Sequence, residues 1–154
     1  MKLSGIIATA LAASVAAAVK FDIQVVGEGP YNDKYIVPQT YGDEGNQVLA
    51  MSSDSPNDGI EFDEASTTLK TTLDGQTKYG FLLPWSSTMP KEISFQDMPI
   101  TDQQSTLIND GGYLNVDGVS GNWYVCDDDN GGLLQWADSD NDGCYKASLK
   151  LVEH

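Results

Sequence analysis

The sequence predicts an all-β fold, a single antiparallel β-sandwich of many short strands. Apolar and polar residues alternate with a period of two in several segments, which is typical of strands with one buried face. Clusters of Gly, Asn, Asp, Pro and Ser separate these segments at intervals of about ten residues, as expected for strands joined by hairpins. A β-trefoil-like closed barrel is the alternative, although we find no convincing threefold repeat.

The predicted strands follow one another along the chain without an intervening helical period. We count roughly eleven or twelve candidates from the alternation and the turn signals. The clearest hairpin spans residues 112–126. The segments that alternate most cleanly are residues 21–25, 60–63, 92–96 and 145–151. Pairing of the first and last of these segments would close the domain.

The first 18 residues have the pattern of a cleavable secretory signal peptide. Lys2 supplies a short basic region, residues 3–15 are mostly apolar, and a run of alanines ends in Ala18. We expect cleavage after Ala18, so that residues 19–154 form a single all-β domain. No later apolar run approaches the length of a membrane span. We therefore expect a secreted, extracellular product that does not bind a membrane.

The charge balance excludes nucleic acid as a partner. The chain contains 23 Asp and Glu residues against 8 Lys and no Arg, and its formal net charge is −15. Binding to nucleic acid or to an anionic membrane needs cations that neutralise phosphates. With this surplus of acids we expect neither kind of partner, and we expect a monomer.

The residue types argue against an enzyme. The only His is the terminal residue, His154, where chain ends commonly fray, so histidine triads and two-His metal sites are not expected. The sequence has no nucleophile elbow, aspartic protease motif or phosphate loop. A pair of carboxylates acting as a small glycosidase is the chemistry left open. We predict no catalytic residue.

The two cysteines predict a disulfide. Cys126 and Cys144 are the only cysteines of a chain that carries an export signal, and such residues are usually oxidised. Closing a loop of this length is worth about 3 kcal/mol in the chain-entropy model. A single bridge leaves most of the stabilisation to the core.

An acidic segment suggests a calcium site. Asp138, Asp140 and Asp142 have the spacing of the alternate carboxylates in a calcium-binding loop. The bidentate Glu that such a loop needs at its twelfth position is replaced by Leu149, so an ordinary EF-hand is rejected. A looser site that borrows carboxylates from residues 127–129 competes with a solvated acidic turn that protects a sheet edge.

The three tryptophans suggest one glycan contact. Trp85 follows Leu-Leu-Pro and precedes two serines, which favours a loop where an aromatic ring could stack on a sugar. Trp123 lies in an alternating segment and Trp136 follows two leucines, so we expect both in the core.

Residues 110–152 combine several of these features. An aromatic-rich strand ends in Cys126, another apolar segment covers residues 133–136, and Cys144 begins an alternating segment. In this order the chain resembles the small secreted cell-wall proteins of filamentous fungi and yeasts, the PhiA-like group. The resemblance implies a fungal source, association with the cell wall and a non-catalytic role, and it carries over only the disulfide.

Two classes of function follow. The first is a secreted, non-catalytic fungal cell-wall-associated or extracellular surface protein with a structural or interaction role. The alternative is an extracellular module that binds polysaccharide or calcium, or a secreted effector that acts on a host. The expected partners are cell-wall polysaccharide or proteins of the wall or of a host. No cofactor is expected beyond Ca2+ in the calcium-binding alternative.

Overall fold

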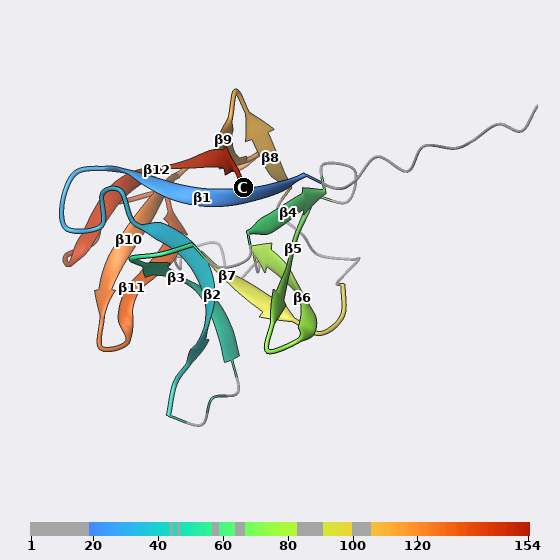
Figure 1. Ribbon diagram of the computed structural model, residues 1–154. Coiled ribbons are helices and arrows are strands. Elements are labelled where there is room, and N and C mark those ends of the chain that lie inside the picture. The colour runs from blue at the N-terminus through green and yellow to red at the C-terminus, as the bar shows by residue number, and fades with distance from the viewer. Residues whose placement is uncertain are drawn as a thin grey trace, which may run out of the picture.

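A computed structural model describes residues 19–43, 45, 47–56, 59–63, 67–82, 91–99 and 106–154. In these residues the protein consists of twelve β-strands without a helix, which confirms the all-β prediction (Figure 1). A helix able to cross a membrane is therefore not found in this part of the chain. The predicted signal peptide lies outside the described residues.

The strands are short and follow one another closely. Four of the alternating segments named above fall within strands β1, β4, β7 and β12. The strands are β1 (Lys20–Gly27), β2 (Tyr35–Tyr41), β3 (Gln47–Ser53), β4 (Ile60–Asp63), β5 (Thr68–Leu73), β6 (Gln76–Leu82), β7 (Lys91–Gln96), β8 (Leu107–Asp110), β9 (Tyr113–Val116), β10 (Asn122–Asp128), β11 (Gly131–Ala137) and β12 (Cys144–Glu153).

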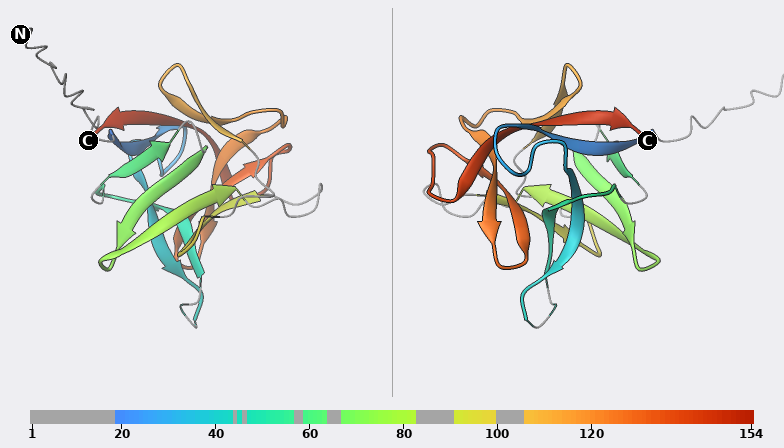
Figure 2. Two further views of the ribbon diagram at one scale, coloured as in Figure 1. Left: turned by 90° about the vertical axis from the view of Figure 1, so that its right-hand side faces the viewer. Right: turned by 60° about the vertical axis from the view of Figure 1, so that its left-hand side comes forward.

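The sheet closes on itself as an antiparallel barrel. Nine strands form the ring in the order β1-β4-β5-β6-β7-β3-β11-β10-β12, and β12 returns to β1. The closing pair is long, because residues 21–27 face residues 147–153, and the two strands lie side by side in Figure 2. The expected pairing of the first and last segments is confirmed. Strand β2 pairs with β1 and β3, and the β8–β9 hairpin attaches to β12.

The closed ring does not support a sandwich, which has two separate sheets. It supports the barrel that the sequence left as the alternative. The alternation of apolar and polar residues fits a sandwich and a barrel equally well, because each architecture buries one face of every strand. Which strand closes the ring depends on pairing between distant segments, and periodicity carries no information about that.

Two four-strand units share one pairing pattern. In the first unit, β1 to β4, the outer strands pair and the inner two form a hairpin. In the last unit, β9 to β12, the outer strands also pair and the inner two form a hairpin. Strands β3, β7 and β11, which lie four apart in the chain, pair with one another. The first and last units therefore share the pattern of outer and inner pairs, whereas in the described residues of β5 to β8 the outer strands are not paired with each other.

The core fills the inside of the barrel with alternate residues from most strands. Burial of each such aliphatic or aromatic side chain is worth roughly 1.5–3 kcal/mol. The most deeply buried members include Ile23, Val25, Leu69, Leu82, Ile93, Leu107, Leu114, Val125, Leu134 and Leu149. In β1 and β12 these positions alternate with more exposed ones, so there the period of two seen in the sequence corresponds to the inside and the outside of the barrel; in β7, β10 and β11 consecutive residues are buried.

The C-terminal residue is held against the first strand. The backbone N–H of His154 donates to the carbonyl oxygen of Lys20 at 2.9 Å. Its ring Nδ1 lies 2.8 Å from a carboxylate oxygen of Asp22. The expectation that this end frays is therefore wrong, because both the backbone and the ring of His154 contact residues of β1.

Candidate functional site

The candidate site forms where strand β12 changes partners. Along one edge β12 pairs first with β10, where Ala147 faces Trp123, and then with β9, where Leu149 faces Leu114. Ser148 lies at the junction. In the described residues β9 and β10 do not pair with each other, so the hairpin predicted over residues 112–126 is wrong. Its two strands exist, but β12 joins them.

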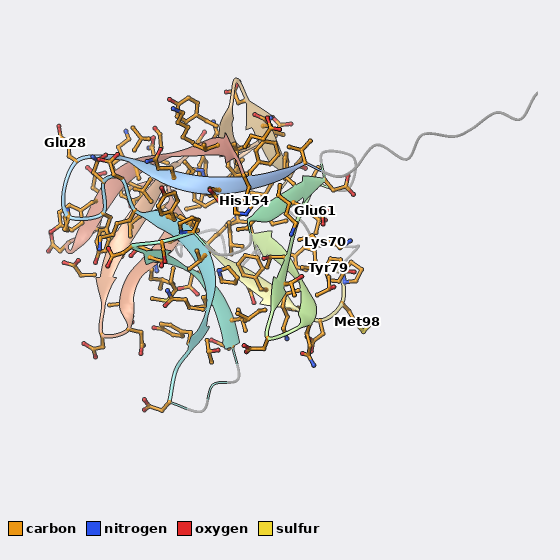
Figure 3. All side chains as sticks on the ribbon, in the orientation of Figure 1. Glu28, Glu61, Lys70, Tyr79, Met98 and His154 are labelled. Carbon is orange, nitrogen blue, oxygen red and sulfur yellow. A yellow bond between two sulfur atoms is a disulfide. The ribbon has the colours of Figure 1, made fainter. Side chains whose placement is uncertain are left out.

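A groove runs along the outside of β12 and the end of β1. Its volume is about 520 Å³, within the range of ligand-binding clefts. Its charged groups are one acid and one base, Glu28 and Lys146, and Figure 3 shows Glu28 pointing outward beyond the end of β1. The lining consists of Val26, Gly27, Glu28, Asn122, Cys144, Tyr145, Lys146, Ala147 and Ser148.

The aromatic ring in this groove is held from two sides. A Cβ built on Gly29 would lie 2.4 Å from the ring of Tyr145, so only a glycine lets the chain approach so closely. Tyr31 packs edge-on against the same ring with centroids 5.8 Å apart. Tyr31 is in turn fixed because its hydroxyl donates to Asp127 at 2.7 Å. Tyr145 is therefore a preorganised aromatic surface in the groove.

Burial, with help from Asp127, raises the pKa of Tyr31 to about 12. The hydroxyl therefore stays protonated, and keeps its hydrogen bond to Asp127, at every pH in which the protein would ordinarily function. The support of Tyr145 does not depend on a group that titrates near neutral pH.

A second, smaller hollow continues from the groove. Its volume is about 140 Å³, roughly ten times what one water molecule needs. The two cavities share Asn122, Ala147 and Ser148 in their walls. The hollow is lined by Tyr113, Leu114, Asn115, Gly121, Asn122, Trp123, Trp136, Ala147, Ser148 and Leu149. It lies at the junction where β12 leaves β10 for β9.

Two tryptophans form the inner wall of this hollow. Trp123 and Trp136 face each other on β10 and β11, with ring centroids 5.0 Å apart at 74°. They are 3% and 5% exposed, so the prediction that both belong to the core is confirmed. The ring N–H of Trp123 donates to the carbonyl oxygen of Leu114 at 2.8 Å and thereby joins β10 to β9.

The other indole lacks such a bond. The Nε1 of Trp136 is buried and has no hydrogen-bond partner in the described structure. A Cβ built on Gly121 would lie 2.6 Å from this nitrogen, so the glycine backbone lies directly against it. A buried donor without an acceptor costs about 1–3 kcal/mol. Trp136 thus carries an unsatisfied polar group that the Gly121 backbone covers.

The first unit has a hollow in the corresponding place. It is lined by the first, second and fourth strands of its unit, and its volume is about 10 Å³, whereas the hollow of the last unit is lined by the corresponding strands and also by Trp136 of the third. That volume is at the lower limit for one water molecule. Pro38, Ile36 and Pro56 are among the residues that fill it. Of these two corresponding positions, the last unit has the one with room for a ligand.

Two acidic side chains, Asp128 and Asp140, accept hydrogen bonds from tyrosines. Tyr41 donates to Asp128 at 2.9 Å, and Tyr124 donates to Asp140 at 2.5 Å. These bonds raise the pKa of Tyr41 and of Tyr124. The backbone N–H of Asn130, with Tyr41, lowers the pKa of Asp128. These acids hold strands and turns together through neutral phenol groups.

The predicted calcium ligands are not gathered into a cluster. In the described residues no group of three His, Cys, Asp or Glu side chains has an arrangement suited to a metal ion. Asp140 accepts a hydrogen bond from Tyr124. Calcium binding by these three residues stays a prediction.

The predicted disulfide is confirmed. Cys126 and Cys144 are bonded and lie directly opposite each other on β10 and β12. The backbone N–H of Asp127 donates to the carbonyl oxygen of Gly143 at 2.7 Å, so the cysteines occupy the close, non-hydrogen-bonded type of pair. Cys144 lines the groove next to Tyr145, so the bridge holds one end of the site.

Sequence reasoning missed most of this site. Trp85, the predicted glycan contact, lies outside the described residues. Tyr145 and Asn122 were not singled out, although Tyr145 follows Cys144 in a cleanly alternating segment. That alternation places Tyr145 on one face of a strand. The groove forms because β1 lies beside β12, and the alternation does not predict that pairing.

Comparisons with known proteins give no further guide. No family model, no curated protein and no solved structure matches the chain. The geometry and chemistry of the described residues are therefore the basis for the function proposed below.

Proposed function

We propose that this protein is a secreted, non-catalytic protein of the fungal exterior that binds a neutral cell-wall polysaccharide through the groove along β12. The observation that carries this proposal is a cleft of about 520 Å³ that contains a firmly held tyrosine ring beside neutral amide and hydroxyl groups. Sugar rings are recognised by stacking on aromatic faces and by hydrogen bonds to such groups.

The charge of the chain favours a neutral polymer. With a formal net charge of −15 the protein repels polyanions such as acidic polysaccharides. The groove itself contains Glu28 and Lys146, whose charges cancel. A neutral glycan meets neither a repulsive field nor an unpaired charge there.

The lining favours binding over hydrolysis. Glycoside hydrolysis uses two carboxyl groups on opposite sides of the bond that breaks. Among the described residues that line the groove and the hollow, Glu28 is the one carboxylate. The proposed role is therefore retention on a polymer, in line with the non-catalytic role that the PhiA-like resemblance implies.

At the level of fold, we propose a β-trefoil-like barrel. The pairing pattern that the first and last units share supports it, as does the mutual pairing of β3, β7 and β11. In such a fold one unit can acquire a binding site while the others only support the barrel. The difference between the first and last units has this character.

The proposal is tested by retention on insoluble polysaccharide. The full chain is produced with its own N-terminal segment in a secreting host, and the purified product is mixed with chitin and with β-glucan at mildly acidic pH. We expect saturable retention that does not change when calcium is replaced by a chelator. Failure of the unaltered protein to bind either polymer would contradict the proposal and direct the search to protein partners.

A matched pair of variants locates the binding surface. Tyr145→Ala removes the ring from the groove and should reduce retention at least fivefold. Tyr79→Ala removes a ring from β6, on the β5–β6 side of the molecule in Figure 3, and should leave retention unchanged. Equal retention by both variants would exclude the groove as the surface.

A further inference from the structure

We propose that Tyr113 is a second stacking position for the polysaccharide, so that one neutral chain runs from the groove past Ser148 to Tyr113 and contacts both places. This inference rests on the proposed function and adds two properties to it. The ligand is an extended chain of several sugars, and Tyr113 contributes to the affinity when the chain is long enough to reach it.

The groove adjoins the surface around Tyr113. Tyr113 lines the hollow, which has part of its wall in common with the groove. The residues that belong to both walls are Asn122, Ala147 and Ser148. On the β9–β12 pair Tyr113 lies opposite Lys150, and the four residues from Lys146 of the groove to Lys150 span ~13 Å at about 3.3 Å per residue. A ligand that contacts both places is therefore longer than one sugar ring.

Tyr113 lies on the outer face of the barrel. Leu114 and Leu149 face each other in the core. Successive side chains of a strand point to opposite faces, so Tyr113 and Lys150, one residue further along each strand, lie outside. Ser148 of the groove is also outside, because it precedes Leu149 on β12. A chain that leaves the groove at Ser148 therefore reaches Tyr113 without crossing to another face.

Tyr113 is the tyrosine most open to solvent. It is 40% exposed, whereas the other six tyrosines, all of them in the described residues, are buried or half-buried. Tyr31, Tyr41 and Tyr124 donate hydrogen bonds to aspartates and hold the structure together. Tyr113 has no such bond to another described residue. Its ring is therefore free to contact a ligand.

The backbone on both sides of Tyr113 is fixed. The N–H of Leu151 donates to the carbonyl oxygen of Gly112 at 2.8 Å. The ring N–H of Trp123 donates to the carbonyl oxygen of Leu114 at 2.8 Å. Because its two chain neighbours are held by β12 and β10, Tyr113 has a defined position. A ring on a fixed backbone loses less conformational entropy on binding than a ring on a loose segment.

The surface beside β12 combines exposed apolar side chains with neutral polar groups. Of the five large apolar side chains that are exposed in the described residues, Val26 and Tyr113 lie on the two strands that flank β12. Ser148, which pairs with Val26, and Asn115 supply a hydroxyl and an amide near them. Sugars have apolar ring faces and hydroxyl edges, so this combination suits a chain of neutral sugars.

The test is calorimetry with soluble oligosaccharides of chitin and of β-glucan, from the disaccharide to the hexasaccharide. We expect the affinity of the unaltered protein to rise at least tenfold over this series. Tyr113→Ala should weaken binding of the hexasaccharide at least fivefold and leave binding of the disaccharide unchanged. Tyr113→Phe keeps the ring and should bind like the unaltered protein. Tyr79→Ala, the control on β6, should change neither affinity.

A measurement on the unaltered protein covers the case in which Tyr113→Ala does not fold. Nitration by tetranitromethane modifies exposed tyrosines first, so peptide mass spectrometry should find Tyr113 among the earliest sites. Saturating hexasaccharide should slow the nitration of Tyr113 at least fivefold. The disaccharide, which is too short to reach from the groove, should not slow it.

The outcomes separate this inference from the proposed function. If the unaltered protein is retained on polymer but its affinity does not rise with chain length, the second position is overturned and the groove stands. The same conclusion follows if folded Tyr113→Ala keeps the full rise, or if Tyr113 is nitrated equally fast under saturating hexasaccharide. If the unaltered protein binds neither polymer nor oligosaccharide, both proposals fail.

Discussion

The first and last units share the pairing of their outer strands and of their inner strands, but they enclose very different spaces. In the first unit, side chains such as Pro38 and Ile36 nearly fill the hollow between its strands, leaving about 10 Å³. In the last unit two tryptophans and two asparagines surround about 140 Å³. The difference teaches that two things together decide whether a cavity forms. In the described residues β1 and β2 pair with each other, whereas β9 and β10 do not, and the side chains that line the two spaces also differ.

The largest effect is expected from the bridge that only the last unit carries. Replacing both cysteines, Cys126→Ser with Cys144→Ser, should lower the free energy of unfolding by about 3 kcal/mol. Urea unfolding followed by far-UV circular dichroism measures this loss. Because the bridge joins β10 to β12 at the groove, retention on polymer should also fall. Unchanged stability would mean that the last unit needs no covalent closure.

The two indoles of the last unit should respond differently to loss of their N–H groups. Trp123→Phe leaves the carbonyl of Leu114 without its donor, whereas Trp136→Phe removes a donor that has no acceptor. Both variants lose aromatic area, so we expect Trp123→Phe to be more destabilising by about 1–2 kcal/mol. Thermal or urea unfolding of the pair measures the difference. Equal losses would show that the N–H of Trp136 is satisfied in solution.

The tyrosines of the first unit tie it to the last unit, and this connection should fail in alkali. Tyr31 donates to Asp127, and its pKa is raised to about 12. Because the folded state holds this proton more tightly than the unfolded chain, the stabilisation is complete below the ordinary tyrosine pKa near 10 and is lost as pH rises through about 12. The free energy of unfolding should therefore fall over this window.

Tyr31→Phe tests the origin of that fall. The variant lacks the titrating hydroxyl, so its unfolding free energy should be about 1 kcal/mol lower at neutral pH and should decline less between pH 10 and 12. A decline as steep as that of the unaltered protein would assign the alkaline loss to other groups.

The smallest effect is expected at the acidic turn. Asp140→Asn keeps an acceptor for Tyr124 and should change the free energy of unfolding by less than about 0.5 kcal/mol. Under the polysaccharide proposal, calcium and a chelator should give the same melting temperature. A melting temperature that rises with calcium in the unaltered protein and not in Asp140→Asn would instead establish the predicted calcium site.

The N-terminal prediction is checked on the secreted product. If residues 1–18 act as a signal peptide, the protein recovered from the medium should begin at Val19, as read by N-terminal sequencing or by intact mass. Retention of the chain inside the host would contradict secretion. The recovered protein is the material for all the measurements above.

The local alternation of apolar and polar residues was enough to predict the strands but not enough to predict which strands pair. The alternation around Ile93 and Phe95 predicts β7, and the alternation around Leu149 and Leu151 predicts β12. The same kind of reasoning joined residues 112–126 into a hairpin that does not exist, because Trp123 faces Ala147 and Leu114 faces Leu149. A turn of Gly and Asp indicates where the chain bends, but not which strand then lies alongside.

The sequence by itself determined the all-β class, the core positions of Trp123 and Trp136, and the single disulfide. These depend on residue type and on neighbours along the chain, through burial of one strand face and oxidation of paired thiols. Only the tertiary structure decided the closed barrel, the groove around Tyr145 and the open hollow of the last unit. Each of these depends on contacts between strands that are far apart in the sequence, such as β1 with β12, and such contacts leave no period in the order of residues.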